Sequence, residues 1–198
     1  MSGSGKDTVA NFLCTRYNFV KLSFASVLKD IVAIVFDWPR PMLEGDTRES
    51  REWREQEDSW WASKLCTPGL TPRRVLQMIG TDVMRTHFHK DIWIFALEKR
   101  LRTVSANVVV TDARFPNEVA MLRDCGGIIV KIQRGPVPDW FEDYLHDTSR
   151  MPEDVHPSEY AWAPACEQGA HIVLMNNGTI EDLHHKVDAF YSSCSTPE

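Results

Sequence analysis

The stretch Gly3-Ser4-Gly5-Lys6-Asp7-Thr8, at the start of the sequence, constrains the fold more than any other. Small residues let backbone N–H groups wrap phosphate oxygens, a lysine reaches the β- and γ-phosphates, and a following helix points its positive end at them. Apolar residues at helical spacing over residues 5–17 predict that helix. The stretch therefore predicts a phosphate-binding loop, with a flexible Ser/Gly segment as the alternative.

The loop departs from the G-x-x-x-x-G-K-[ST] pattern in two ways. Its first glycine would fall before Met1, and Asp7, followed by Thr8, stands where a serine or threonine usually holds Mg²⁺. An aspartate can itself bind Mg²⁺, directly or through water. A buried strand normally precedes such a loop. We expect that strand upstream of this sequence rather than a truncated sheet, because a gap would leave buried backbone groups unpaired.

Four short apolar segments predict strands, at residues 20–23, 107–111, 128–132 and 171–175. Helical periodicity falls between or after them, over residues 24–36, 71–83, 91–102, 116–124 and 179–191. This alternation predicts an α/β fold with a parallel sheet flanked by helices. We expect one domain over residues 1–192, with residues 40–102 as a helical insertion or lid, and a disordered tail at 193–198.

Asp112 and Arg114 directly follow the predicted strand 107–111, at the edge where parallel sheets bind ligands. An aspartate there would hold Mg²⁺ or orient an attacking phosphate oxygen. An arginine would grip phosphate with its planar fork. The alternative is an Asp–Arg pair that caps the helix beginning near Pro116.

A second polar group comes from the predicted helix that starts at Thr71-Pro72. Arg73 and Gln77 share a face and Arg74 lies beside them, so the group suits an anion and a base edge. A solvated helix face is the alternative.

Trp53, Trp60 and Trp61 are predicted to lie on one helical face, and Trp93 follows further along the chain. These tryptophans could stack on a base, although an aromatic helix face is more often packed in the core.

Composition narrows the function classes. The 198 residues include 22 Lys+Arg and 28 Asp+Glu, a formal net charge of −6, which argues against a general DNA-coating surface. The five cysteines form no C-x-x-C pair, and the seven histidines show no metal-ligand spacing. No apolar run approaches the length of a membrane span. We expect a cytoplasmic protein acting on small molecules, without a membrane partner or stable nucleic-acid binding.

Taken in order, these segments resemble the deoxynucleoside monophosphate kinases of tailed bacteriophages. In that family an aspartate characteristically follows the loop lysine, as it does in Gly5–Thr8. The resemblance continues through Ser26–Asp30, Arg48, Arg73–Gln77, Gly80–Asp82, Trp93, Asp112–Arg114, Glu118, Arg134 and Asn176–Gly178. The order and rough spacing of the blocks make it specific, whereas no single block would.

The resemblance implies the nucleoside-monophosphate-kinase form of the P-loop NTPase fold, transferring phosphate from ATP, with Mg²⁺, to a deoxynucleoside monophosphate for phage DNA precursor synthesis in the host cytoplasm. It implies ATP binding by Gly3, Ser4, Gly5, Lys6, Asp7, Thr8 and Arg134. It implies acceptor binding by Lys29, Arg48, Arg73, Arg74, Gln77 and Trp93. Lys6, Asp112 and Arg114 would act at the transfer centre, with Asp7 and Asp112 as metal ligands.

Two other functions fit the residues. One is another small P-loop kinase, with a modified pyrimidine nucleotide or a phosphomevalonate-type acceptor, because similar Gly-Lys-Asp loops occur there. The other is a non-catalytic nucleotide-binding remnant, suggested by the abrupt start. The accepted base depends on a few hydrogen bonds that the sequence does not reveal. The oligomeric state is likewise not readable, with a homodimer as the candidate assembly.

Overall fold

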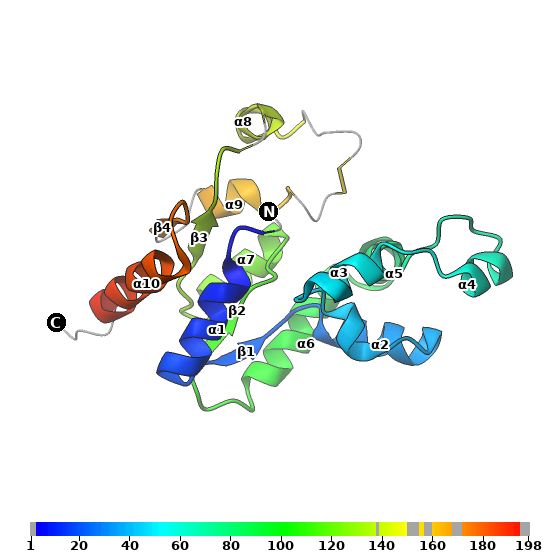
Figure 1. Cartoon of the computed structure of the whole chain (residues 1–198), viewed down its shortest axis with the longest axis horizontal. Coiled ribbons are helices and arrows are strands. Elements are labelled where there is room, and N and C mark those ends of the chain that lie inside the picture. Colours follow the sequence, from blue (N-terminus) through cyan, green and yellow to red (C-terminus); the bar gives the residue numbers. More distant parts are fainter. Residues whose placement is uncertain (1–2, 138, 150–154, 157–159, 168–171, 195–198) are drawn as a thin grey trace. The chain divides into compact units, whose positions relative to one another are not determined.

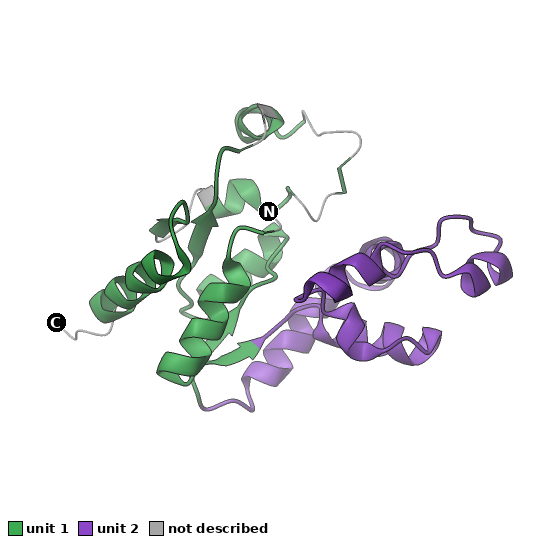
Figure 2. Ribbon diagram, in the orientation of Figure 1, with its two compact units in different colours: residues 1–21, 106–198 green, residues 22–105 purple. Residues whose placement is uncertain are grey.

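The computed structural model describes residues 3–137, 139–149, 155–156, 160–167 and 172–194. The chain divides into two compact units (Figure 2). Unit 1 comprises residues 1–21 and 106–198, and unit 2 comprises residues 22–105. The second unit begins earlier than the predicted insertion at residues 40–102. None of the described helices is long and apolar enough to cross a membrane.

The strands of unit 1 form two pairs. β1 (Val20–Leu22), at the boundary of the unit, pairs with β2 (Val108–Val110), and β3 (Val130–Gln133) pairs with β4 (Ile172–Met175). β3 and β4 run parallel, with Val130 opposite Ile172. All four predicted strands are confirmed. The expectation of one continuous sheet is not met among the described strands, and β2 is half-buried rather than buried on both faces. The upstream strand concerns residues before Met1 and stays a prediction.

Helices pack on these strands (Figure 1). α1 (Lys6–Tyr17) contacts β2 and α10 (Ile180–Cys194), and the other helices of the unit are α7 (Pro116–Asp124), α8 (Asp139–His146) and α9 (Ala163–Glu167). The main core joins Val9 of α1 to Leu174 of β4 and to Leu183 and Val187 of α10. α10 extends through Cys194, so the first two residues of the predicted tail are helical, and residues 195–198 lie outside the described part.

Unit 2 is helical. Its elements are α2 (Ser26–Phe36), the 3₁₀ helix η1 (Arg40–Leu43), α3 (Arg48–Arg54), α4 (Ser59–Lys64), α5 (Pro72–Gln77), the π-helix η2 (Met78–Phe88) and α6 (Ile92–Leu101). Its core is built from aliphatic side chains on several of these elements, including Val32, Leu43, Val75 and Leu97. The predicted helices at 24–36 and 91–102 are confirmed within a few residues.

The prediction of one aromatic helix face over residues 44–66 is wrong. Trp53 lies on α3 and Trp61 on α4, because the chain turns at Asp58, whose side chain caps α4 by accepting from Trp61 N. Asp58 also accepts from Trp38 Nε1 at 2.7 Å, and Trp61 Nε1 donates to the Phe36 carbonyl at 3.0 Å. These indoles therefore join helices within unit 2.

The helix from Thr71 starts as predicted and continues differently. The Thr71 hydroxyl accepts from Arg74 N at 3.2 Å, which confirms the N-cap. From Met78 the chain is π-helical, and a π-helix advances each residue by a smaller angle than an α-helix. The apolar positions of the helix predicted over residues 71–83 therefore do not stay on one buried face: Val75 is buried and Val83 is 46% exposed.

Trp93 links α6 to η2 through a hydrogen bond of its indole N–H. Its side chain is 4% exposed, and its Nε1 donates to the Gly80 carbonyl at 2.8 Å. The indole satisfies a carbonyl that is itself buried, since Gly80 is a buried residue of η2.

Trp93→Phe should lower the free energy of unfolding by about 1–3 kcal/mol, because the buried Gly80 carbonyl loses the indole N–H while most of the ring remains. Chemical denaturation of the purified variant measures the change. The matched control is Trp60→Phe, at a 58% exposed position, which should leave stability nearly unchanged. Equal losses for the two variants would contradict the structural role of the Trp93 N–H.

Candidate functional site

The loop that precedes α1 has a conformation that glycine permits. Gly3 and Gly5 have φ angles of 79° and 104°, in the left-handed region. α1 begins at Lys6, and among the described residues no side chain caps this end. A β-carbon added to Gly3 would meet nothing within 4 Å, so the loop is open there. An uncapped helix end beside an open glycine loop suits the oxygens of an anion.

Lys6 and Ser4 lie together at this loop. The Lys6 Nζ donates to the Ser4 hydroxyl at 3.2 Å, and Ser4 is 5% exposed. The lysine side chain therefore folds back along the loop that it follows. A cation held at that point adds to the positive helix end, and both favour a bound phosphate.

Asp7, in the first turn of α1, is held by two neighbours. Its Oδ1 lies 2.7 Å from Lys21 Nζ on β1 and accepts from the Thr111 hydroxyl at 3.3 Å. Burial alone would raise the pKa of Asp7, but the hydrogen bonds and charges of Lys21, Thr111 and Lys6 outweigh it and hold the pKa below its ordinary value. Asp7 is thus ionised at neutral pH, as a ligand of Mg²⁺ must be.

The segment after β2 is tied to the same turn. Asp112 directly follows Thr111, so the bond from Thr111 to Asp7 brings the segment that carries Asp112 to the start of α1. Asp112 is half-buried and Arg114 is exposed. The described residues contain no group of three or more His, Cys, Asp or Glu that could hold a metal. A Mg²⁺ ion held by Asp7 or Asp112 would therefore need phosphate and water oxygens as its further ligands.

Glu118 orders the backbone at Arg114, a role that our sequence analysis did not assign. It is 1% exposed and accepts from Arg114 N at 2.6 Å and from Phe115 N at 3.1 Å. Glu118 thus caps the start of α7 by accepting from two backbone N–H groups. The signal was present, because a glutamate three residues into a helix that starts with proline is typical of a capping box.

Arg134 directly follows β3 and is exposed. The next residue is anchored, since Gly135 N donates to the Asn177 side chain at 3.2 Å after β4. The guanidinium is therefore exposed next to a fixed backbone position.

In unit 2, Lys29 belongs to an ion-pair network. Its Nζ lies 2.5 Å from Glu44, and Glu44 also binds Arg40. Arg40 in turn contacts Asp30 at 2.6 Å, and Asp30 lies 3.5 Å from Arg100. The three cations outnumber the two carboxylates, so the network carries a net positive charge. Of these five residues, only Lys29 was predicted from the sequence to belong to a site. The Arg40–Glu44 spacing of four residues was a local signal, whereas Arg100 comes from the distant α6.

The other predicted acceptor residues are spread over α3 and α5, which contact each other. Arg48 is exposed and pairs with Glu52 at 2.6 Å, Arg73 pairs with Glu55 at 3.0 Å, and Arg74 donates to the Pro68 carbonyl at 3.2 Å. Gln77 is half-buried, and its side-chain amide forms no hydrogen bond with any of the described residues. Trp93 is different, because its ring is buried and its N–H is already used by Gly80.

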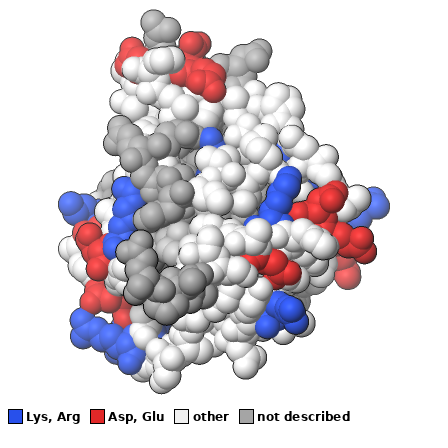
Figure 3. Space-filling model, turned by 90° about the vertical axis from the view of Figure 1, so that its left-hand side faces the viewer, with Lys and Arg blue, Asp and Glu red and all other residues white. Residues whose placement is uncertain are grey.

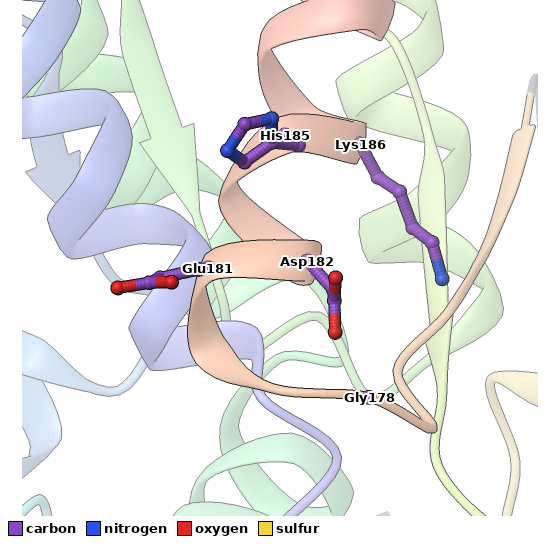
Figure 4. Close-up of a pocket in the computed structure, with 5 residues that line it drawn as sticks. All are labelled: Gly178, Glu181, Asp182, His185 and Lys186. Carbon is purple, nitrogen blue, oxygen red and sulfur yellow. The ribbon is translucent and has the colours of Figure 1, made fainter.

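A hollow on α10 is lined by Gly178, Glu181, Asp182, His185 and Lys186 (Figure 4). Two of its side chains have structural partners. Asp182 accepts from Thr179 N at 2.8 Å at the start of α10, and Lys186 donates to the Met175 carbonyl at 2.6 Å. We therefore assign the hollow no catalytic role. On the face shown in Figure 3, the charged side chains of the described residues are interspersed by sign and form no single basic surface.

Helices on parallel strands, with a glycine loop that runs into an uncapped helix, are compatible with the α/β kinases, a class of phosphotransferases. A family model described as deoxynucleotide monophosphate kinase matches residues 65–187. A protein of Acanthamoeba polyphaga mimivirus that is assigned as a deoxynucleotide monophosphate kinase is 30% identical, over 93% of this chain and 89% of its own length. The chain belongs to the deoxynucleotide monophosphate kinase family, and it is a phosphotransferase.

A second relative matches locally. The deoxynucleoside-5'-monophosphate kinase of Escherichia phage T5 is 41% identical over 56 residues, which is 28% of this chain and 22% of that protein. Both relatives come from viruses, and the second comes from a bacteriophage, in agreement with the resemblance to phage kinases.

Glu44→Gln should weaken the pH dependence of stability in acid. Burial alone would raise the pKa of Glu44, but its bonds to Lys29 and Arg40 hold the pKa below the ordinary value of 4.5. The ionised carboxylate therefore stabilises the fold above pH 4.5, and this contribution is lost as the pH falls through the lowered pKa. Thermal unfolding followed from pH 7 to pH 3 measures the slope.

The matched control for this experiment is Glu49→Gln, because Glu49 is exposed and has no ion pair with a described residue. The control should retain the acid slope of the parent protein. A Glu44→Gln protein with the parental slope would show that Glu44 does not link Lys29 to Arg40 in solution.

Proposed function

We propose that the chain catalyses ATP + dNMP → ADP + dNDP, on an α/β fold of the P-loop NTPase kind with residues 1–192 as one kinase domain. The observation that carries the proposal is the glycine loop, which has positive φ angles at Gly3 and Gly5, is open at Gly3, and runs into the uncapped end of α1 with Lys6 folded along it. The family supports a deoxynucleotide acceptor over phosphomevalonate-type or modified-pyrimidine acceptors, and an enzyme over a non-catalytic remnant.

On the donor side, ATP binds at residues 3–8. Backbone N–H groups of the loop and of the first turn of α1 hold the phosphate oxygens, and Lys6 offsets charge on the β- and γ-phosphates. Asp7 and Asp112 are the residues that would hold Mg²⁺, which neutralises phosphate oxygens when it is bound. Arg134, beside the anchored Gly135, would contact the ATP phosphates as a lid residue.

On the acceptor side, the monophosphate binds through Lys29, Arg48, Arg73 and Arg74, and Gln77 reaches the base. Lys29 and Arg73 already have carboxylate partners, so an acceptor phosphate must share these cations with Glu44 and Glu55. Trp93 acts differently from the prediction: we assign it to supporting η2 from within the core, because its polar atom is already used.

Transfer consists of positioning and charge stabilisation. A phosphate oxygen of the dNMP attacks the γ-phosphorus, the bond from that phosphorus to the β–γ bridging oxygen breaks, and ADP leaves. Lys6 and Arg114 stabilise the charge that spreads over the transferred group, and Asp112 orients the attacking oxygen. The viral relatives further support the host cytoplasm as the compartment, with products that feed DNA precursor synthesis.

Lys6→Ala should lower kcat by about two to three orders of magnitude, because a cation aimed at developing charge is lost. A coupled assay of ADP formation with each of the four dNMPs measures it. Lys99→Ala is the matched control, because Lys99 is exposed on α6 and is not part of the proposed site; it should retain full activity.

Two results would reject the proposed function. Full activity of the Lys6→Ala protein would remove the donor site from the loop. ATP binding by the parent protein without ADP formation, for every dNMP, would favour the non-catalytic alternative. A panel that adds phosphomevalonate and modified pyrimidine nucleotides tests the remaining acceptor classes.

A further inference from the structure

The segment Asn176-Asn177-Gly178 follows β4 and has no part in the mechanism above. Asn176 is 8% exposed, and its side-chain Nδ2 donates to the Ser4 carbonyl at 2.9 Å. Its backbone N donates to the Gln133 carbonyl at 2.7 Å, which continues the pairing of β4 with β3. The amide that reaches the loop is thus held in place by the strand pair behind it.

The loop is packed tightly on that amide. A β-carbon added to Gly5 would lie 2.5 Å from Asn176 Nδ2 and 3.3 Å from Leu183 Cδ2 on α10. Real β-carbons do not approach other atoms so closely, so Gly5 is needed for its small size as well as for its positive φ. The Ser4 carbonyl is therefore hydrogen-bonded to Asn176, and Gly5 packs closely against Asn176 and against Leu183 of α10.

The second asparagine contacts another segment of the proposed donor site. Asn177 Oδ1 accepts from Gly135 N, the residue after Arg134. The other end of the junction is also fixed, since Asp182 accepts from Thr179 N and from the Thr179 hydroxyl at 2.8 and 2.9 Å. The segment after β4 thus joins the glycine loop to the backbone beside Arg134.

We propose that Asn176 is the positioning residue of the donor site, holding the glycine loop in its phosphate-binding conformation through the Ser4 carbonyl, with Asn177 holding the Arg134 segment to the same junction. This inference rests on the proposed function. In this role Asn176 acts through the Ser4 carbonyl of the loop. An amide is required because the group that faces a carbonyl must donate, and a carboxylate of the same shape would place oxygen against oxygen.

The test compares Asn176→Asp and Asn176→Ala with Asn11→Asp, a control at an exposed position on α1. For each protein we would measure the kcat, the KM for ATP, the KM for the dNMP and the melting temperature. We expect kcat/KM for ATP to fall about tenfold or more in both Asn176 variants, with the KM for the dNMP unchanged. Asn11→Asp should behave as the parent protein does.

Binding of a fluorescent ATP analogue, measured without acceptor, separates this inference from the proposed function. If the parent protein binds the analogue and turns over no dNMP, the proposed reaction fails, while weaker binding by the Asn176 variants still supports the positioning role. Unchanged ATP parameters in folded variants, or an equal loss for ATP and dNMP, would overturn it. Failure of both variants to fold would show a general structural role and would overturn it as well.

Discussion

A buried carbonyl needs a donor, and for Ser4 this donor comes from Asn176, far along the chain. Much of unit 1 depends on this contact. The loop keeps its conformation because it rests on the amide, the amide is fixed because β4 pairs with β3, and the strands are covered by α1 and α10. The helix that the loop starts thus contributes apolar residues to the core beneath it, so the fold and the phosphate-binding conformation are stabilised together.

Electrostatics distinguishes the two units. In unit 1 the carboxylate of Asp7 lies beside Lys21 and Lys6, and these cations help to hold its pKa below the ordinary value. In unit 2 several cations are paired with carboxylates, as Lys29 is with Glu44 and Arg73 with Glu55. An acidic protein of net charge −6 can therefore present local positive charge to nucleotides without a basic surface. The carboxylate Glu44 also links Lys29 to Arg40 within this unit.

Local patterns predicted most of the helices and all four strands, because apolar spacing reports which face of a segment is buried. They failed where the tertiary structure changes the local period or turns the chain. The helix predicted over residues 71–83 continues as a π-helix, so Val83 is exposed. The tryptophans expected on one helix are divided between α3 and α4. A local sequence pattern reflects only residues that are close in the sequence. The π-helix at Met78 and the division of the tryptophans depend on how helices that are distant in the sequence pack together.

The sequence by itself determined the loop at residues 3–8, the helix behind it and the family to which the chain is similar, since these depend on residue type at fixed spacing. It also indicated Glu118 through its capping pattern, although no role was assigned. Only the tertiary structure decided that Trp93 is a core residue, that Arg100 joins Lys29 in one network, and that Asn176 supports Ser4. Hydrogen bonds and ion pairs between distant segments leave no periodic pattern, because either partner alone is an ordinary polar residue.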